Sequence, residues 1–104
     1  MLISTTESIA GKQVVETIGI AKGNTIRARH LGSDLLAGLK SLIGGEISQY
    51  TRLMDDSREQ AISRMIEDAK SMNADAIVNV RFTTSTLMGG AAELLAYGTA
   101  VKLR

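Results

Sequence analysis

The segment from Glu93 to Leu103 constrains the fold of this chain more than any other. Its side chains alternate between two faces, as in a β-strand, and both faces are apolar. Leu95 and Val101 share one face, and Leu94 and Ala96 share the other. A strand of this kind is normally covered on both sides, so both faces of its sheet must find cover.

Other alternating stretches predict the rest of the sheet. Strands are expected over residues 2–6, 13–21 and 76–84, with a further extended stretch over 25–29. Gly23 and Asn24 are expected to supply a turn or a bulge before that stretch. The alternation in 13–21 places Val14, Ile18 and Ile20 on one face. In 76–84 it places Ala76, Val78, Val80 and Phe82 on one face and Ile77, Asn79, Arg81 and Thr83 on the other.

Two segments change to the helical period of about 3.6 residues. Residues 33–43 carry one apolar stripe, and residues 47–72 carry a longer one. The second segment is expected as one continuous helix, with a start near Ser57 as the alternative, because a capping-box pattern begins there. Arg64 and Asp68 lie four residues apart on its polar side, which favours an ion pair.

The balance between sheet and helix predicts an oligomer. A single long helix covers only one face of a four-stranded sheet, and the other face would remain in water. Burial of about 800 Å² per partner is typical of a stable interface and would remove this exposed apolar area. The alternative is a monomer in which the 33–43 helix folds over the second face.

Composition narrows the class of protein further. The 104 residues fit a single domain over 1–104, and cysteine is absent. Twelve basic and eleven acidic residues are scattered along the chain, so the sequence shows no nucleic-acid footprint. It also lacks a secretory signal pattern and an apolar run long enough to span a membrane. We therefore expect a cytoplasmic protein that neither inserts into membranes nor binds nucleic acid.

A set of residues spread over nearly the whole chain resembles the YbjQ-like family of small uncharacterised proteins, whose label refers to heavy-metal binding. The residues are Gly19, Gly23, Gly44-Gly45-Glu46, Tyr50-Thr51, Leu53, Arg58, Ala61, Met65, Ala69, Ala74-Asp75-Ala76-Ile77, Val80-Arg81-Phe82 and Tyr97-Gly98-Thr99-Ala100-Val101. The resemblance implies an α+β, dodecin-like β-α-β-β subunit, with an antiparallel sheet packed on one long helix in two layers. It also implies a closed ring of subunits, a homopentamer, and no established activity.

The metal label can be weighed against the ligands that the chain offers. Soft and borderline metals prefer thiolate or imidazole, and here there is one histidine and no cysteine. His30 with Asp34 is the weak candidate pair, with a structural histidine as the favoured interpretation. Methionines 54, 65 and 72 lie on the apolar stripe and are interpreted as core residues. We expect no cofactor and no metal.

Charged residues within the strands and on the long helix suggest where a ligand would bind. Glu16 and Arg81 lie within expected strands, where they would pair with each other if those strands are adjacent. Otherwise Glu46, Tyr50, Arg58 and Arg81 would line a cleft between subunits. Gly44-Gly45 before Glu46 is interpreted as a tight turn between helices, and less readily as an anion site.

Three functions are compatible with the sequence. The first is a non-enzymatic homo-oligomeric scaffold or binding protein with a small ligand held between subunits. The second is a small-molecule enzyme that uses the same cleft, and the third is metal binding through His30. No serine, histidine and acid constellation and no recognisable pair of carboxylates supports catalysis, so the first function is preferred.

Overall fold

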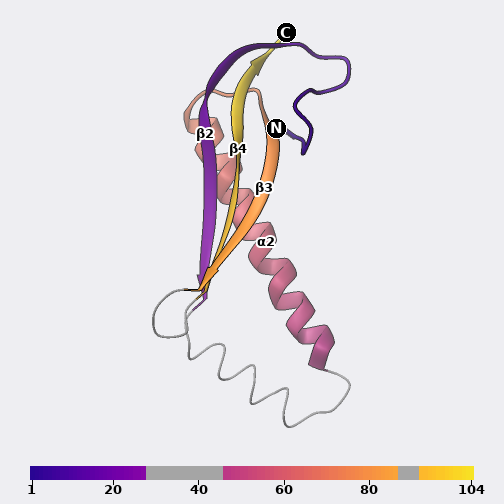
Figure 1. Ribbon diagram of the computed structural model, residues 1–104, viewed down its shortest axis with the longest axis vertical. Coiled ribbons are helices and arrows are strands. Elements are labelled where there is room, and N and C mark those ends of the chain that lie inside the picture. Colours follow the sequence, from indigo (N-terminus) through magenta and orange to yellow (C-terminus); the bar gives the residue numbers. More distant parts are fainter. Residues whose placement is uncertain (28–45, 87–91) are drawn as a thin grey trace.

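A computed structural model describes residues 1–27, 46–86 and 92–104, and in this part of the chain one helix lies on one face of a four-stranded sheet (Figure 1). The elements are β1 (Leu2–Ile3), β2 (Val14–Arg27), α2 (Glu46–Ser71), β3 (Ala76–Thr86) and β4 (Ala92–Leu103). The strand order is β1-β3-β4-β2, with β4 between β3 and β2. The α+β fold is therefore confirmed, while the segment expected as a first helix over 33–43 lies outside the described residues.

The sheet is mixed, whereas an antiparallel one was expected. β4 pairs antiparallel with both β2 and β3, but β1 runs parallel to β3, with Leu2 opposite Ala76. β1 is also shorter than the expected 2–6, because Ser4 and Thr6 bond the bulged part of β3 outside a regular ladder. The N-terminus thus adds a short parallel strand to the three-stranded antiparallel sheet.

Helix α2 is continuous, as its apolar stripe predicts. Ala61, Met65 and Ala69 face the sheet and are fully buried. Ser57, the alternative start, lies inside the helix and is 3% exposed. The helix ends where Asn73 takes a left-handed conformation with φ of 61°, which lets the Ala74 N–H donate to the Ala69 carbonyl at 3.1 Å.

β2 runs without interruption through Gly23, where a turn or bulge was expected. A Cβ atom at this position would lie 2.2 Å from the Met65 nitrogen and 2.4 Å from the Ala61 oxygen. The glycine is needed because the backbone of α2 packs directly against the strand. Small residues on both sides, including Ala21 and Ala61, allow this close approach of helix and sheet.

Bulges in β2 and in β3 change which side chains share a face. The register of β2 against β4 shifts between Thr17 and Gly19, so Ile18 packs toward α2 while Ile20 remains 69% exposed. The prediction that Ile18 and Ile20 share a face was therefore wrong. Alternation assumes an unbroken ladder, and an extra residue in one strand reverses the side that follows.

The bulge in β3 lies at Asn79. Val78 pairs with Thr99 and Arg81 pairs with Tyr97, so two residues of β3 oppose one residue of β4. Asn79 is left-handed, with φ of 55°, a conformation that asparagine tolerates better than most residues. Val78 and Val80 consequently belong to different clusters, although simple alternation placed them on one face.

A second apolar cluster lies on the face of the sheet opposite α2. Its buried members are Ala76, Val78 and Val101, and Ile9 and Val14 pack against them. The N-terminal segment thereby covers one end of this face. As expected, β4 contributes to both sides of the sheet, with Ala96 and Ala100 in the cluster under α2 and Val101 in the opposite one.

Candidate functional site

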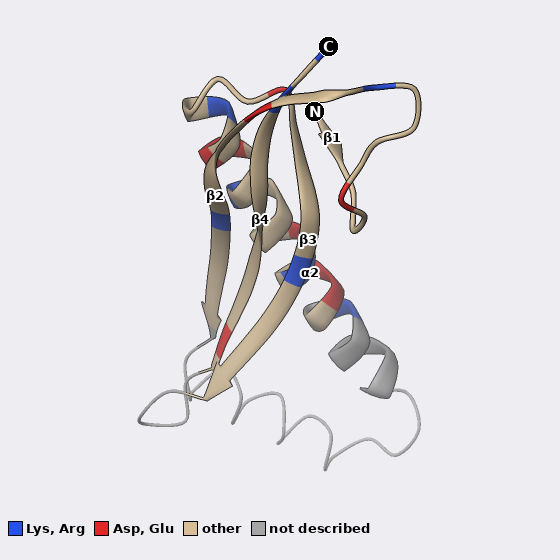
Figure 2. Cartoon of the chain, turned by 45° about the horizontal axis from the view of Figure 1, so that its top comes forward, with Lys and Arg blue, Asp and Glu red and all other residues tan. Residues whose placement is uncertain are grey.

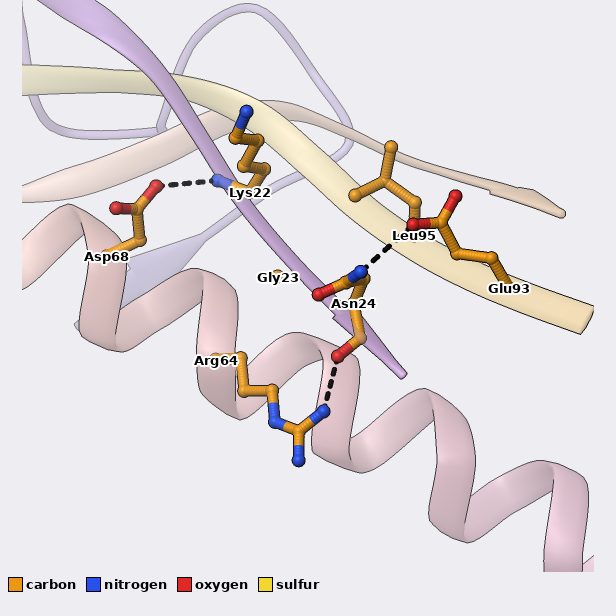
Figure 3. A pocket seen from close by; sticks show the side chains of 7 residues that line it. All are labelled: Lys22, Gly23, Asn24, Arg64, Asp68, Glu93 and Leu95. Atoms are coloured by element: carbon orange, nitrogen blue, oxygen red, sulfur yellow. Dashed lines mark hydrogen bonds between the residues drawn. The ribbon is translucent and has the colours of Figure 1, made fainter. Parts of the chain in front are cut away.

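A groove of about 530 Å³ follows the outer edge of β2, where the strand faces helix α2 (Figure 3). We call it the edge groove. Its lining residues come from β2, α2 and β4 and are Lys22, Gly23, Asn24, Arg64, Asp68, Glu93 and Leu95. The close contact at Gly23 positions the helix so that its polar side chains reach the edge of the sheet.

Two side chains of α2 bond the backbone of β2. The peptide N–H of Lys22 donates to Asp68 Oδ2 at 3.0 Å, and Arg64 Nη1 donates to the Asn24 carbonyl at 2.5 Å. The two donors and acceptors are spaced alike on both elements. The two residues from Lys22 to Asn24 rise about 6.6 Å along a strand, and the four residues from Arg64 to Asp68 rise about 6 Å along a helix. Arg64 and Asp68 therefore act as caps for a sheet edge, and in the described structure they do not form the ion pair expected from their spacing.

A third interaction joins the two strands beside the groove. Asn24 Nδ2 donates to Glu93 Oε2 at 2.9 Å, and both side chains are partly buried. Each carboxylate of the lining thus already accepts a hydrogen bond, from Lys22 N–H or from Asn24. With Lys22 and Arg64 as cations, the groove offers charges of both signs and is suited to binding polar groups.

Arg81 and Arg58, two residues predicted for a ligand site, lie on different layers of the subunit. Arg81 is in register with Tyr97, and its Nη1 donates to the carbonyls of Thr5 and Val80, each at 2.8 Å. Arg58 is on α2 and forms an ion pair with Asp55. Within one chain, the described contacts do not bring the two guanidinium groups together.

The structure tells less about the other charged or polar residues that the sequence suggested for a site. Glu46 and Tyr50 belong to the first turns of α2, and their side chains lie outside the described part. Glu16 is opposite Lys102 on β4, and β4 separates it from Arg81, so the strands are not adjacent as that pairing required.

The structure describes only some of the residues considered for metal binding. His30 and Asp34 lie outside the described residues, as do Gly44 and Gly45, which were expected to form a turn. Among the residues that are described, no group of three or more His, Cys, Asp or Glu side chains is close enough to hold an ion. Met65 is fully buried and Met72 packs against the same core, which confirms their interpretation as core residues.

The sequence did not identify Lys22, Asn24 and Glu93 as lining residues. The available signal was Gly23 between two polar residues in a strand rich in valine and isoleucine, together with the i,i+4 pair on the helix. Both patterns have ordinary local explanations, a turn and a surface ion pair. Only the docking of α2 onto β2 shows that they meet.

Charges of both signs alternate over the surface of the described chain. Figure 2 shows acidic and basic residues interleaved along α2, with isolated charges on the strands. The exposed surface of these elements is therefore mixed in charge. The described helix is also too polar to cross a bilayer.

Comparison with known proteins identifies close relatives over the full length. The family model described as "Putative heavy-metal-binding" (YbjQ) matches residues 1–104. A UPF0145 protein of Halorubrum lacusprofundi is 59% identical over 104 residues, covering 100% of both chains. A UPF0145 protein of Methanosarcina acetivorans is 57% identical over 103 residues, covering 99% of this chain and 97% of its own.

A solved structure supports the fold. A crystal structure of a protein of unknown function from Pediococcus pentosaceus superimposes with a TM-score of 0.65 at 16% identity, covering 100% of this chain and 98% of the other. The likeness at this identity concerns architecture alone. From the family match over its whole length and relatives above 50% identity, we conclude that the chain belongs to the YbjQ family, whose members here carry the name UPF0145.

Proposed function

We propose that this protein is a non-enzymatic, cytoplasmic homo-oligomer, a pentameric ring, that serves as a scaffold or binds a small ligand between its subunits. The observation that carries the proposal is the uncovered face of the sheet. We call it the helix-free face and define it by Ile20, Ile26, Arg81, Leu95 and Tyr97, which the register places on the side opposite α2.

Large apolar side chains on this face are in water in the single chain. Ile20 is 69% exposed and Ile26 is 56% exposed. Complete burial of a side chain of this size contributes about 1.5–3 kcal/mol, so covering the face would release a substantial free energy. A second copy is the occupant we propose, because the N-terminal segment already covers the other end of the same face and Ile20, Ile26 and Tyr97 remain exposed on it.

An intersubunit cleft accounts for the placement of the charged candidates. Arg81 belongs to the sheet layer and Arg58 to the helix layer, so a neighbouring copy is needed to bring the two side chains to one site. We propose that this cleft includes Arg58 and Arg81, with Glu46 and Tyr50 at the start of α2. The number of five subunits rests on family likeness alone.

Light scattering coupled to size-exclusion chromatography tests the assembly. We expect the protein at micromolar concentration to form a particle five times the 11.1 kDa of one chain. Ile20→Lys should dissociate it, because a charge on the helix-free face cannot be buried without a partner. Ser63→Lys, an exposed change on α2, is the matched control and should leave the mass unchanged.

A folded 11.1 kDa monomer for the unmodified protein would contradict the proposal.

A second measurement distinguishes binding from catalysis. A small molecule that co-purifies with the unmodified protein should be lost in Arg81→Ala. If the unmodified protein releases that molecule chemically unaltered, the protein binds it without turnover. Conversion of that molecule would establish the enzymatic alternative instead.

A further inference from the structure

The helix and the sheet diverge at the end of the subunit where β2 and β3 finish and β4 begins. In Figure 1 the C-terminal half of α2 lies along the strands, whereas its N-terminal half leads away from them. A small pocket of about 80 Å³ lies at this point. We call it the wedge pocket, and its lining residues are Thr25, Met54, Ser57, Thr84, Ala92, Glu93 and Leu94.

Thr25 is the unusual member of this lining. Its side chain is 2% exposed, and its Oγ1 has no hydrogen-bond partner among the groups that the structure describes. A buried hydroxyl without a partner lowers stability, because it loses its bonds to water and gains none in return. Valine has nearly the same shape without this cost, so packing alone does not explain a threonine here.

The rest of the lining indicates what kind of partner would fit. Met54, Ala92 and Leu94 present apolar surface, and the Glu93 carboxylate already accepts a hydrogen bond from Asn24. A cavity of roughly 150 Å³ holds a benzene molecule of six heavy atoms. A pocket of about 80 Å³ therefore accommodates a molecule of roughly three or four heavy atoms.

From these observations we propose that the wedge pocket binds a small neutral molecule with a compact apolar body and one oxygen, such as a short alcohol or ketone. Its oxygen pairs with Thr25 Oγ1, and its carbon atoms contact Met54 and Leu94. The site lies within one subunit, so it does not depend on the proposed assembly. None of its lining residues belongs to the residues proposed for the cleft, Glu46, Tyr50, Arg58 and Arg81.

The test is an NMR titration of the protein with 2-propanol, followed through the amide signals of the lining residues. We expect saturable shifts for the unmodified protein. Thr25→Val should weaken binding at least ten-fold, because it removes the hydroxyl and keeps the shape. Thr25→Ser should stay within three-fold, and Thr83→Val, at an exposed position in the same sheet outside the pocket, is the control that should bind normally.

Two further probes define the chemistry of the site. Xenon, which is apolar, should enter both the unmodified protein and Thr25→Val, whereas isopropylammonium should enter neither.

Without ligand, Thr25→Val should melt at a higher temperature than the unmodified protein. Ala92→Met, which fills the pocket from its exposed rim, should block 2-propanol and provides a test that does not alter Thr25.

Several results would overturn the proposal. These are an absence of saturable shifts at the lining residues, equal binding by Thr25→Val, or tighter binding of isopropylammonium than of 2-propanol. A lower melting temperature for Thr25→Val would show that the hydroxyl already has a partner in the free protein. A bound water that 2-propanol cannot displace would assign the pocket to solvent.

Discussion

The peptide N–H of Lys22 donates to a carboxylate oxygen of Asp68, 3.0 Å away on the facing helix. This bond occupies a donor at the outer edge of β2, where no other described strand pairs with it. Arg64 occupies the Asn24 carbonyl two residues further on. An unpaired edge can pair with the strand of another molecule, so these two side chains restrict where such pairing occurs.

Removing the Asp68 carboxylate should expose this edge locally. We expect the Lys22 amide in Asp68→Ala to exchange its hydrogen roughly five-fold faster, corresponding to a bond contribution of about 1 kcal/mol. Amide hydrogen exchange by NMR measures the effect residue by residue. Glu67→Ala changes the neighbouring exposed acid and should leave the Lys22 amide as it is; equal acceleration in both variants would contradict a specific cap.

Gly23 and Gly19 give a matched pair for the contact between helix and strand. A Cβ at Gly23 would lie 2.2 Å from the Met65 nitrogen, whereas a Cβ at Gly19 would meet nothing within 4 Å. Gly23→Ala should therefore lower the free energy of unfolding by about 3 kcal/mol or more, since backbone atoms must move. Gly19→Ala should change it by about 1 kcal/mol at most. Urea denaturation compares the two, and a similar loss in both would show that the close approach is not what requires glycine at position 23.

The two left-handed asparagines should respond in the same way to substitution. Asn73 ends α2 and Asn79 forms the bulge of β3, with φ of 61° and 55°. Alanine at either position should cost about 1 kcal/mol, because its Cβ disfavours this conformation. Glycine carries no such penalty and should be tolerated at both. Thermal unfolding of the four variants checks this; alanine as stable as glycine would argue against a left-handed backbone.

Elemental analysis of tag-free protein addresses the metal that the family description suggests. We expect no near-stoichiometric metal, because the chain has one histidine and no cysteine to supply soft or borderline ligands. His30→Ala is the comparison variant. A metal present in the unmodified protein and lost in His30→Ala would establish the alternative function.

The sequence predicted those elements whose signal is local and regular. Helix α2 was recognised from a stripe over many turns, and the two faces of β4 from simple alternation. Alternation failed at Ile18 and at Val80, because a bulge depends on how a strand pairs with its partner. Gly23 was misread for a related reason, since the helix that demands it is distant in the chain.

The candidate sites were predicted less well than the fold. The edge groove depends on bonds between side chains of α2 and the backbone of β2, 40 and 46 residues apart in the sequence. No single-sequence pattern encodes such a pairing. The wedge pocket is harder still to predict, because Thr25 is an ordinary strand residue until the packing around it is known.

The bulge at Asn79 also determines which changes in chain length this subunit can absorb. Val78 and Arg81 already point to the same side of the sheet, so a chain lacking Asn79 would become a regular strand with every other β3 residue facing as before. Its main loss would be the tether from Asn79 N–H to the Thr6 carbonyl. Deleting Thr83 instead would move the side chain of every later β3 residue to the other face of the sheet. Asn79 is therefore a position at which β3 can lose a residue without changing which faces its side chains occupy.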